Sequence, residues 1–163
     1  MKNIVKMLLM LLCISVFPVS AENVQVTGPD GKLTVTVTCS EYGGGIFYSV
    51  SYDGKRMLDR SPLGMQTNIG DFTKGLSITS HVIRPIDKIY SQDRIKTSEI
   101  HYQANELIFA VENARKQKMY ITFRVSNNDI AFRYTLERIG ETGSVIVKDE
   151  ATGFRFPSQT TTF

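Results

Sequence analysis

The sequence predicts an all-β domain built as an antiparallel sandwich, and three observations lead to this fold class. From Asn23 onward, apolar and polar residues alternate along most of the chain, which is the pattern of strands with one buried face. Turn-forming residues separate the alternating segments at short intervals. No segment sustains the periodicity of a helix between capping residues. About ten short strands connected in this way are typical of two packed antiparallel sheets.

The amino-terminal part of this domain is predicted to contain a turn, a strand and a hairpin. One proline and two glycines mark the turn at 28–31, and residues 32–38 then alternate as a strand. A second alternating strand at 46–52 runs into Asp53-Gly54, a residue pair that two-residue hairpin loops prefer. The chain is therefore expected to return through a strand at 55–58.

Further alternating segments predict the strands of the later part. The clearest pair is a hairpin in which residues 119–125 and 130–136 carry matching apolar stripes on either side of the turn at 126–129. Both stripes can be buried on one face of a sheet. The remaining predicted strands lie at residues 76–83, 95–102, 106–111, 145–147 and 154–156.

The first 21 residues are predicted to be a secretory signal peptide, which leaves residues 22–163 as one domain. Residues 1–6 carry two lysines and no acid, residues 7–17 are almost wholly apolar, and Val19-Ser-Ala21 offers the small residues of a cleavage site. The apolar run is about half the length that a bilayer requires, so it is not interpreted as a membrane span. The protein is therefore expected to be exported, either to the periplasm or out of the cell.

Composition and charge narrow the classes of partner. Loss of Lys2 and Lys6 with the signal peptide lowers the formal net charge from +3 to +1. A nearly neutral domain is not expected to bind nucleic acid or, after cleavage, a membrane. The full sequence is 42% hydrophobic and 21% charged, so the domain can bury a core. Cys39, which remains after Cys13 is removed, is interpreted as a small buried hydrophobe and not as a reactive thiol.

Acidic residues in or next to the predicted strands are candidates for the paired carboxylates of a glycosidase. Glu99 and Glu106 are placed in neighbouring predicted strands, where they could meet across a ladder, but the favoured interpretation is that both lie on a solvent-facing surface. Adjacent strand residues point to opposite faces, so Asp149 and Glu150 are not expected to ligate one cation without a bulge in the strand. Glu112 also lies in or next to a predicted strand and completes this set of candidate carboxylates.

Other candidate residues also have structural interpretations. His81 and His101 lie outside any metal-ligand spacing, and Gly43-Gly-Gly45 leads into a strand, so it is interpreted as a turn and not as a phosphate-binding loop. The basic residues 115–118 are expected in a solvated loop. Five tyrosines could stack on sugars, although most are interpreted as core: Tyr42, Tyr48, Tyr52, Tyr90 and Tyr102. The sequence thus predicts no catalytic, cofactor-binding or metal-ligating residue.

The order of several motifs resembles the amino-terminal domain of glycoside hydrolase family 97. These motifs are structural, they cover essentially all of residues 22–163, and none of them is catalytic. They are Val26-Thr-Gly-Pro-Asp-Gly-Lys-Leu33, Tyr48-Ser-Val-Ser-Tyr-Asp-Gly-Lys55, Ser61-Pro-Leu-Gly-Met65, His101-Tyr-Gln-Ala-Asn-Glu-Leu107, Phe123-Arg-Val-Ser-Asn-Asn-Asp-Ile-Ala-Phe-Arg-Tyr134 and Phe154-Arg-Phe-Pro157.

The resemblance implies a β-super-sandwich similar to galactose-mutarotase-like domains, followed by a (β/α)₈ barrel that it packs against. Members of this family are calcium-dependent, exo-acting α-glucosidases or α-galactosidases. Their catalytic groups come from the barrel, and the calcium carboxylate of the sandwich would lie beyond Phe163. No catalytic or calcium-binding position of the family can therefore be assigned to a residue of this sequence.

The leading hypothesis is an amino-terminal, non-catalytic domain of an exported α-glucosidase-like glycosidase. The chain is expected to be truncated before its barrel, inactive alone, and able to help shape the active site of that partner. Through the parent enzyme it would be associated with α-linked oligosaccharides. The alternative is a free-standing periplasmic module that binds sugars or a partner and hydrolyses nothing. An unrelated exported sandwich is a third possibility.

Overall fold

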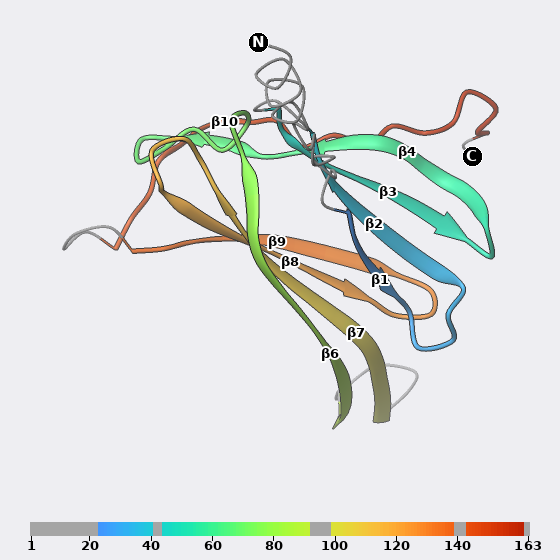
Figure 1. Cartoon of the computed structure of the whole chain (residues 1–163). Helices are drawn as coiled ribbons and strands as arrows, with labels where there is room; N and C mark the ends of the chain where they lie inside the picture. The colour runs from blue at the N-terminus through green and yellow to red at the C-terminus, as the bar shows by residue number, and fades with distance from the viewer. Residues whose placement is uncertain (1–22, 41–43, 92–98, 139–142, 162–163) are drawn as a thin grey trace, which may run out of the picture.

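The structure, a computed structural model, describes residues 23–40, 44–91, 99–138 and 143–161. These residues form ten β-strands and no helix, and every strand pairing is antiparallel. Two four-stranded sheets and one short pair result (Figure 1). The predicted all-β antiparallel fold is thereby confirmed. The described part contains no helix with the length and apolarity to cross a membrane, and the predicted signal peptide lies outside it.

The first sheet, called sheet I, contains the four amino-terminal strands in sequential order. Its members are β1 (Asn23–Thr27), β2 (Leu33–Cys39), β3 (Ile46–Tyr52) and β4 (Lys55–Leu63). Positive φ angles at Asp53 (47°) and Gly54 (76°) close the β3–β4 hairpin, as a two-residue turn of type I′ requires. The predicted hairpin is confirmed, although β4 extends five residues beyond the predicted strand at 55–58.

The second sheet, called sheet II, contains four longer strands, again in sequential order. They are β6 (Ser77–Ser91), β7 (Glu99–Glu112), β8 (Lys118–Val125) and β9 (Ile130–Leu136). The turn between β8 and β9 is closed by Ser126, whose N–H donates to the carbonyl of Asp129 (3.0 Å), so this predicted hairpin is confirmed as well.

Two predictions for sheet II were wrong in their boundaries. The segments at 95–102 and 106–111 were predicted as separate strands, but from Glu99 onward they form one continuous strand, β7. The polar residues Gln103 and Asn105 interrupt the apolar pattern without ending the strand, because their side chains bond to Asp87 and to the carbonyl of Thr27. The strand predicted at 76–83 continues to Ser91 through Pro85, which an edge strand tolerates.

The hydrophobic core lies between the inner faces of the two sheets. β1 lies across from β7 and β2 across from β8, and the rings of Phe109 and Phe123 stack within this layer with their centroids 6.4 Å apart. Each such side chain contributes about 1.5–3 kcal/mol when it is fully buried. The apolar side chains with no exposed surface are Val35, Val37, Ile46, Phe72, Leu107, Phe109, Val111, Met119, Ile121, Phe123 and Val125.

A short third pair, formed by β5 (Met65–Thr67) and β10 (Val147–Glu150), joins distant parts of the chain. β5 has no counterpart among the strands predicted from the sequence, and β10 begins at Val147, where the strand predicted at 145–147 ends. The prediction of a strand at 154–156 is wrong. The chain nevertheless runs beside β4 here, because Gly153 N–H donates to the Pro62 carbonyl (3.0 Å). A regular ladder does not form there, because Arg155 N–H donates to the side chain of Ser61 (2.9 Å).

Two glycines explain why the quoted motifs are structural. Gly64 has a φ of 148°, and a Cβ at this position would overlap the carbonyl oxygen of Phe72. A Cβ on Gly28 would overlap the carbonyl oxygen of Ser126 in the β8–β9 turn. Both positions therefore require glycine so that distant segments can approach each other.

Candidate functional site

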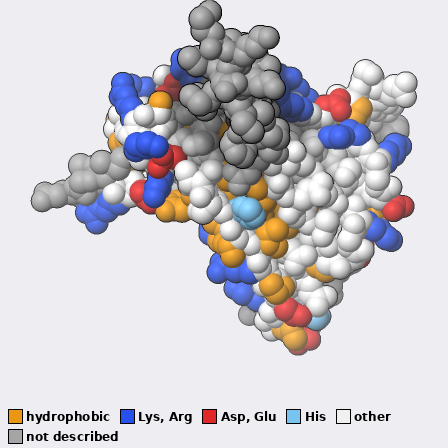
Figure 2. Space-filling model, in the orientation of Figure 1, with side chains coloured by type: hydrophobic (Ala, Val, Ile, Leu, Met, Phe, Trp, Pro, Cys, Tyr) orange, Lys and Arg blue, Asp and Glu red, His pale blue; other side chains and the backbone are white. Residues whose placement is uncertain are grey.

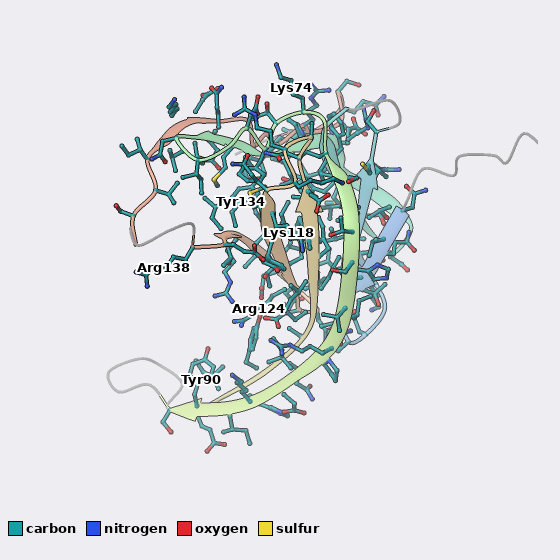
Figure 3. The ribbon with its side chains drawn as sticks, turned by 60° about the vertical axis from the view of Figure 1, so that its left-hand side comes forward. Lys74, Tyr90, Lys118, Arg124, Tyr134 and Arg138 are labelled. Carbon is teal, nitrogen blue, oxygen red and sulfur yellow. The ribbon has the colours of Figure 1, made fainter. Side chains whose placement is uncertain are left out.

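The most distinctive surface of the molecule is the outer face of sheet II. β6 and β7 curve, and Tyr90 and Arg124 lie on the inside of the curve (Figure 3). Since Leu107 and Phe109 of β7 point into the core, the alternate residues of β7 and their cross-strand neighbours point to this outer side. We call it the concave face, and its central residues are Val82, Arg84, Ile86, Tyr90, Tyr102, Glu106, Thr122, Arg124 and Arg133.

A buried carboxylate between two arginines occupies the centre of the concave face. Arg84 of β6, Glu106 of β7 and Arg124 of β8 are direct cross-strand neighbours. The Nε atoms of Arg84 and Arg124 each donate over 2.7 Å, the first to Oε2 and the second to Oε1 of Glu106. Glu106 has no exposed side-chain surface, while the side chains of Arg84 and Arg124 are 62% and 42% exposed. The carboxylate therefore holds two guanidinium groups at fixed positions on the surface.

The electrostatics of this triad keep Glu106 ionised. Burial by itself raises the pKa of Glu106, but hydrogen bonds and charge from Arg124 and Arg84 outweigh burial and bring the pKa below its ordinary value of 4.5. Glu106 is thus a carboxylate at neutral pH, with each oxygen accepting a hydrogen bond from one arginine. It is poorly suited to act as a general acid, and the triad as a whole carries one positive charge.

The structure does not bring the candidate carboxylates together. Glu99 and Glu106 lie in the same strand, seven positions apart, so their side chains point to opposite faces and the meeting across a ladder that was weighed as the less favoured possibility does not occur. The solvent-facing interpretation holds for Glu99 but is wrong for Glu106, because the two arginines cover its carboxylate. Glu112 pairs with Lys116 Nζ at 2.7 Å.

The acids of β10 and the two histidines were interpreted as non-ligating residues, and they are exposed. Asp149 and Glu150 follow one another along β10, while His101 Nε2 lies 2.6 Å from Asp87 Oδ1. The described residues contain no group of three or more histidines, cysteines or acids that could hold a metal ion.

The tyrosines fall into two groups. Tyr48 is buried as predicted; burial, with a smaller effect of Tyr134, raises its pKa to about 12. Tyr52 and Tyr90 are 40% and 42% exposed, so the prediction of a core position was wrong for them. Tyr102 is half-buried on the concave face, and Tyr42 lies outside the described residues.

The remaining candidates have structural surroundings. Cys39 packs against the core but is only half-buried, so the predicted burial is incomplete; its Sγ donates to the carbonyl of Leu76 over 3.2 Å. Gly44 and Gly45 accept backbone hydrogen bonds in the approach to β3, while Gly43 lies outside the described residues. The basic segment at 115–118 forms the exposed turn that leads into β8, apart from the half-buried Gln117.

Among the hollows of the described residues, two involve candidate residues or the concave face. The larger, with a volume of about 650 Å³, lies at one end and is lined by the β5–β6 connection, the β7–β8 turn and Lys148. Its polar groups largely bond to one another: Asn113 Nδ2, for example, donates to the Asp71 carbonyl (3.2 Å) and to Gln117 Oε1 (2.8 Å). The smaller hollow, of about 120 Å³, lies on the concave face and includes Arg124 and Arg133.

The sequence alone does not identify Arg84 and Arg124 as partners of Glu106. Arg124 belongs to one of the quoted motifs, but nothing local to the sequence indicates that it faces Glu106. The relevant signal is the strand register, which places Glu106 opposite Arg84 on one side and Arg124 on the other. The register becomes visible only once β7 is recognised as one strand.

Comparison with known proteins identifies enzymes of one family. A probable retaining alpha-galactosidase from Streptomyces bingchenggensis is 27% identical over 135 residues, which are 83% of this chain and 20% of that protein. The crystal structure of a beta-arabinopyranosidase superposes with a TM-score of 0.80 at 55% identity, over 85% of this chain and 22% of that enzyme. A family 97 glycoside hydrolase from Pseudoalteromonas sp. strain K8, in complex with acarbose, has a TM-score of 0.74 at 19% identity, over 83% of this chain and 20% of that enzyme, and shares the fold.

These comparisons also define how much of each relative is represented. The chain spans about a fifth of the length of the relatives it matches, so the larger part of each enzyme lies outside the matched region. The sequence model of the family described as glycosyl-hydrolase 97 N-terminal matches residues 26–163, and this confirms the resemblance inferred from the motifs. The chain belongs to the glycosyl-hydrolase 97 N-terminal family.

Proposed function

We propose that this chain is the non-catalytic amino-terminal sandwich of an exported glycoside hydrolase. In this proposal it packs against a larger catalytic part, a (β/α)₈ barrel, and helps to shape the active site. Its relatives are enzymes of which it covers about a fifth, and this supports a role as one part of a longer functional unit. The sandwich would then supply a rigid surface, while the chemistry takes place on the other part.

The concave face is the single observation that carries this proposal. It combines exposed apolar side chains, such as Val82 (52% exposed) and Tyr90, with the ordered guanidinium groups of Arg84 and Arg124. Exposed hydrophobic side chains, among them Ile83 and Ile89, also gather on the opposite side of β6, the side that Figure 2 shows. Apolar patches with a polar rim, and arginine in particular, are typical of surfaces that contact another protein domain.

The triad suits such a contact because its arginines retain hydrogen-bonding capacity. A guanidinium group has five N–H donors, and Glu106 accepts from Nε and Nη2 of Arg84 and from Nε of Arg124. The donors that do not engage Glu106 can bind carbonyl or carboxylate oxygens of the opposing surface. Since Glu106 already fixes both side chains, little rotamer entropy is lost when the contact forms.

The substrate and setting of the complete enzyme are part of the proposal. The most similar of these enzymes by sequence is named a beta-arabinopyranosidase and the curated relative a probable retaining alpha-galactosidase, which favours galactose- or arabinose-configured glycosides over the glucosides first expected. Calcium dependence, which the family resemblance implies, is proposed for the complete enzyme. Periplasmic or extracellular localisation is proposed from the signal-peptide pattern of residues 1–21.

A hybrid enzyme tests this function. In the hybrid, this chain replaces the region of the beta-arabinopyranosidase that it matches. We expect the hybrid to hydrolyse a nitrophenyl β-arabinopyranoside with calcium present, whereas the chain alone hydrolyses neither this substrate nor the α-galactoside and α-glucoside. Hydrolysis by the chain alone would contradict a non-catalytic role, and a hybrid that folds without activity would contradict the proposed support of the active site.

Two tyrosines of nearly equal exposure provide a matched pair of positions for testing the docking surface. Tyr90 lies on the concave face, whereas Tyr52 lies at the end of β3 next to the hairpin turn. Tyr90→Asp should lower the activity and heat resistance of the hybrid, while Tyr52→Asp should leave both close to the parent values. Calorimetry with maltooligosaccharides and the chain alone tests the alternative, a free-standing sugar-binding module. Binding heat together with an inactive hybrid would support this alternative.

A further inference from the structure

One edge of sheet II is open at β9. The sheet order is β6-β7-β8-β9, and no described strand pairs with the edge of β9 that faces away from β8. Unpaired backbone N–H and C=O groups along such an edge form a template for an additional strand. β9 is seven residues long and contains no proline, so its edge can pair along its whole length.

The side chains of β9 that point into the sandwich are incompletely covered. Ile130, Phe132, Tyr134 and Leu136 pack against the core but are only half-buried. The corresponding residues of β8, directly opposite in the register, have no exposed surface. The core is therefore closed over β8 and open over β9, although the two strands carry the same alternating pattern.

An aromatic cluster lies at the opening. The ring of Phe154 is 6.2 Å from that of Phe132 and 6.4 Å from that of Tyr48, centroid to centroid. Phe154 nevertheless remains 58% exposed. A large aromatic side chain that contacts core residues and is still mostly exposed marks a surface that lacks its cover.

The two sheets also differ in how far they extend on this side. β1 lies across from β7 and β2 across from β8, and the contact of Tyr48 with Phe132 (5.8 Å) places β3 across from β9. β4, the next strand of sheet I, consequently has no counterpart among the described strands of sheet II. The missing position is the one that a strand paired with β9 would occupy.

We propose that a β-strand from the larger part of the enzyme pairs with the open edge of β9 and lies beneath β4. The strand would present apolar side chains at alternate positions toward Phe132 and Phe154, and its polar residues would face outward. This inference rests on the proposed function, because it requires the catalytic enzyme as the source of the strand. The relatives hold about four fifths of their length outside the matched region, and this supplies the chain from which such a strand can come.

Three single substitutions separate this inference from the proposed function. Phe154→Asp disturbs the open edge, Tyr90→Asp the concave face, and Tyr52→Asp serves as the control. Each is made both in the chain alone and in the hybrid enzyme. The melting temperature is measured for the chain, and the temperature of half-inactivation is measured for the hybrid.

We expect Phe154→Asp to shift the melting temperature of the chain by no more than about 2 °C, since the ring is largely exposed. In the hybrid, the same substitution should lower the temperature of half-inactivation by about 5 °C or more. Tyr52→Asp should produce small shifts in both. Equal shifts for Phe154→Asp in the chain and the hybrid would overturn the strand pairing.

The pattern of results identifies which idea fails. If Tyr90→Asp lowers the temperature of half-inactivation of the hybrid and Phe154→Asp does not, docking on the concave face is retained and the proposed strand at β9 is wrong. The reverse result retains the strand and rejects the concave face as a docking surface. A hybrid that does not fold counts against both, and a chain that forms stable dimers abolished by Phe154→Asp would assign the edge to a second copy of the chain.

Discussion

β8 and β9 are neighbouring strands with nearly the same sequence pattern and very different surroundings. In each, four apolar side chains alternate toward the interior of the sandwich. On β8 these side chains, Met119, Ile121, Phe123 and Val125, are completely buried. On β9 the four equivalents are half-buried, because the strand lies at the sheet edge and the sandwich ends there.

The difference teaches that an alternating pattern indicates which face of a strand is buried in the complete protein. The pattern does not indicate whether the residues that pack against this face belong to the described part of the chain. On β8 the cover comes from sheet I, and on β9 part of it is absent from the described residues. A strand with a core pattern and a half-exposed core face therefore indicates a contact still to be made.

The largest expected effect comes from removing an aromatic ring from each strand. Phe123→Ala should destabilise the chain by about 4 kcal/mol, since the ring is fully buried and a cavity remains. Phe132→Ala should lower the free energy of unfolding by about half as much, because the ring of Phe132 is only partly buried. Urea unfolding of both variants gives the two free energies of unfolding, and equal losses would contradict the contrast between the strands.

Glu106 tests the triad on the outer side of the same sheet. Glu106→Gln should lower stability at pH 7 by about 2 kcal/mol, between the values of exposed and fully buried ion pairs. Glu99→Gln, at an exposed position of the same strand, is the matched control and should change little.

The pH dependence of these variants follows from the depressed pKa of Glu106. The stabilising effect of the carboxylate is complete above the unfolded-state pKa near 4.5 and is lost as pH falls through the lower folded-state pKa. Glu106→Gln should therefore flatten the acid side of the stability profile, when unfolding is followed from pH 6 downward. An unchanged acid profile would show that the triad does not stabilise the ionised form.

The smallest expected effect concerns a hydroxyl group that joins β9 to the segment beside β4. Tyr134 Oη accepts from Gly64 N–H (3.1 Å) and lies 2.6 Å from Thr152 Oγ1. Tyr134→Phe should cost about 1 kcal/mol. Tyr120→Phe, which loses only a bond to the exposed Glu137, should cost less, and thermal unfolding of both proteins allows the comparison.

Much of the fold could be predicted because local chemistry specifies it. Asp53-Gly54 and Ser126–Asp129 define tight turns, and the alternating stripes on either side fix the register of their hairpins. β5 and β10 could not be found in the same way. They are three and four residues long and pair across about half of the chain, so no local pattern indicates them.

The candidate site was harder to predict than the fold. Gln103 and Asn105 break the apolar alternation of β7, and this obscured both the continuity of the strand and the register of Glu106. Burial of Glu106 depends on two arginines that are 22 and 18 positions away in the sequence. Charge pairs of this kind become visible only when the strands are aligned.

Hydrogen exchange of β8 and β9, measured in the chain alone and in the hybrid enzyme, tests the central claim most directly. In the chain alone we expect the amides of β9 that point away from β8 to exchange rapidly and those of β8 slowly. In the hybrid, these β9 amides should become protected by about 100-fold, while β1, the outermost described strand of sheet I, which lies across from β7, should change little. Protection of β9 that is identical in both proteins would contradict the account.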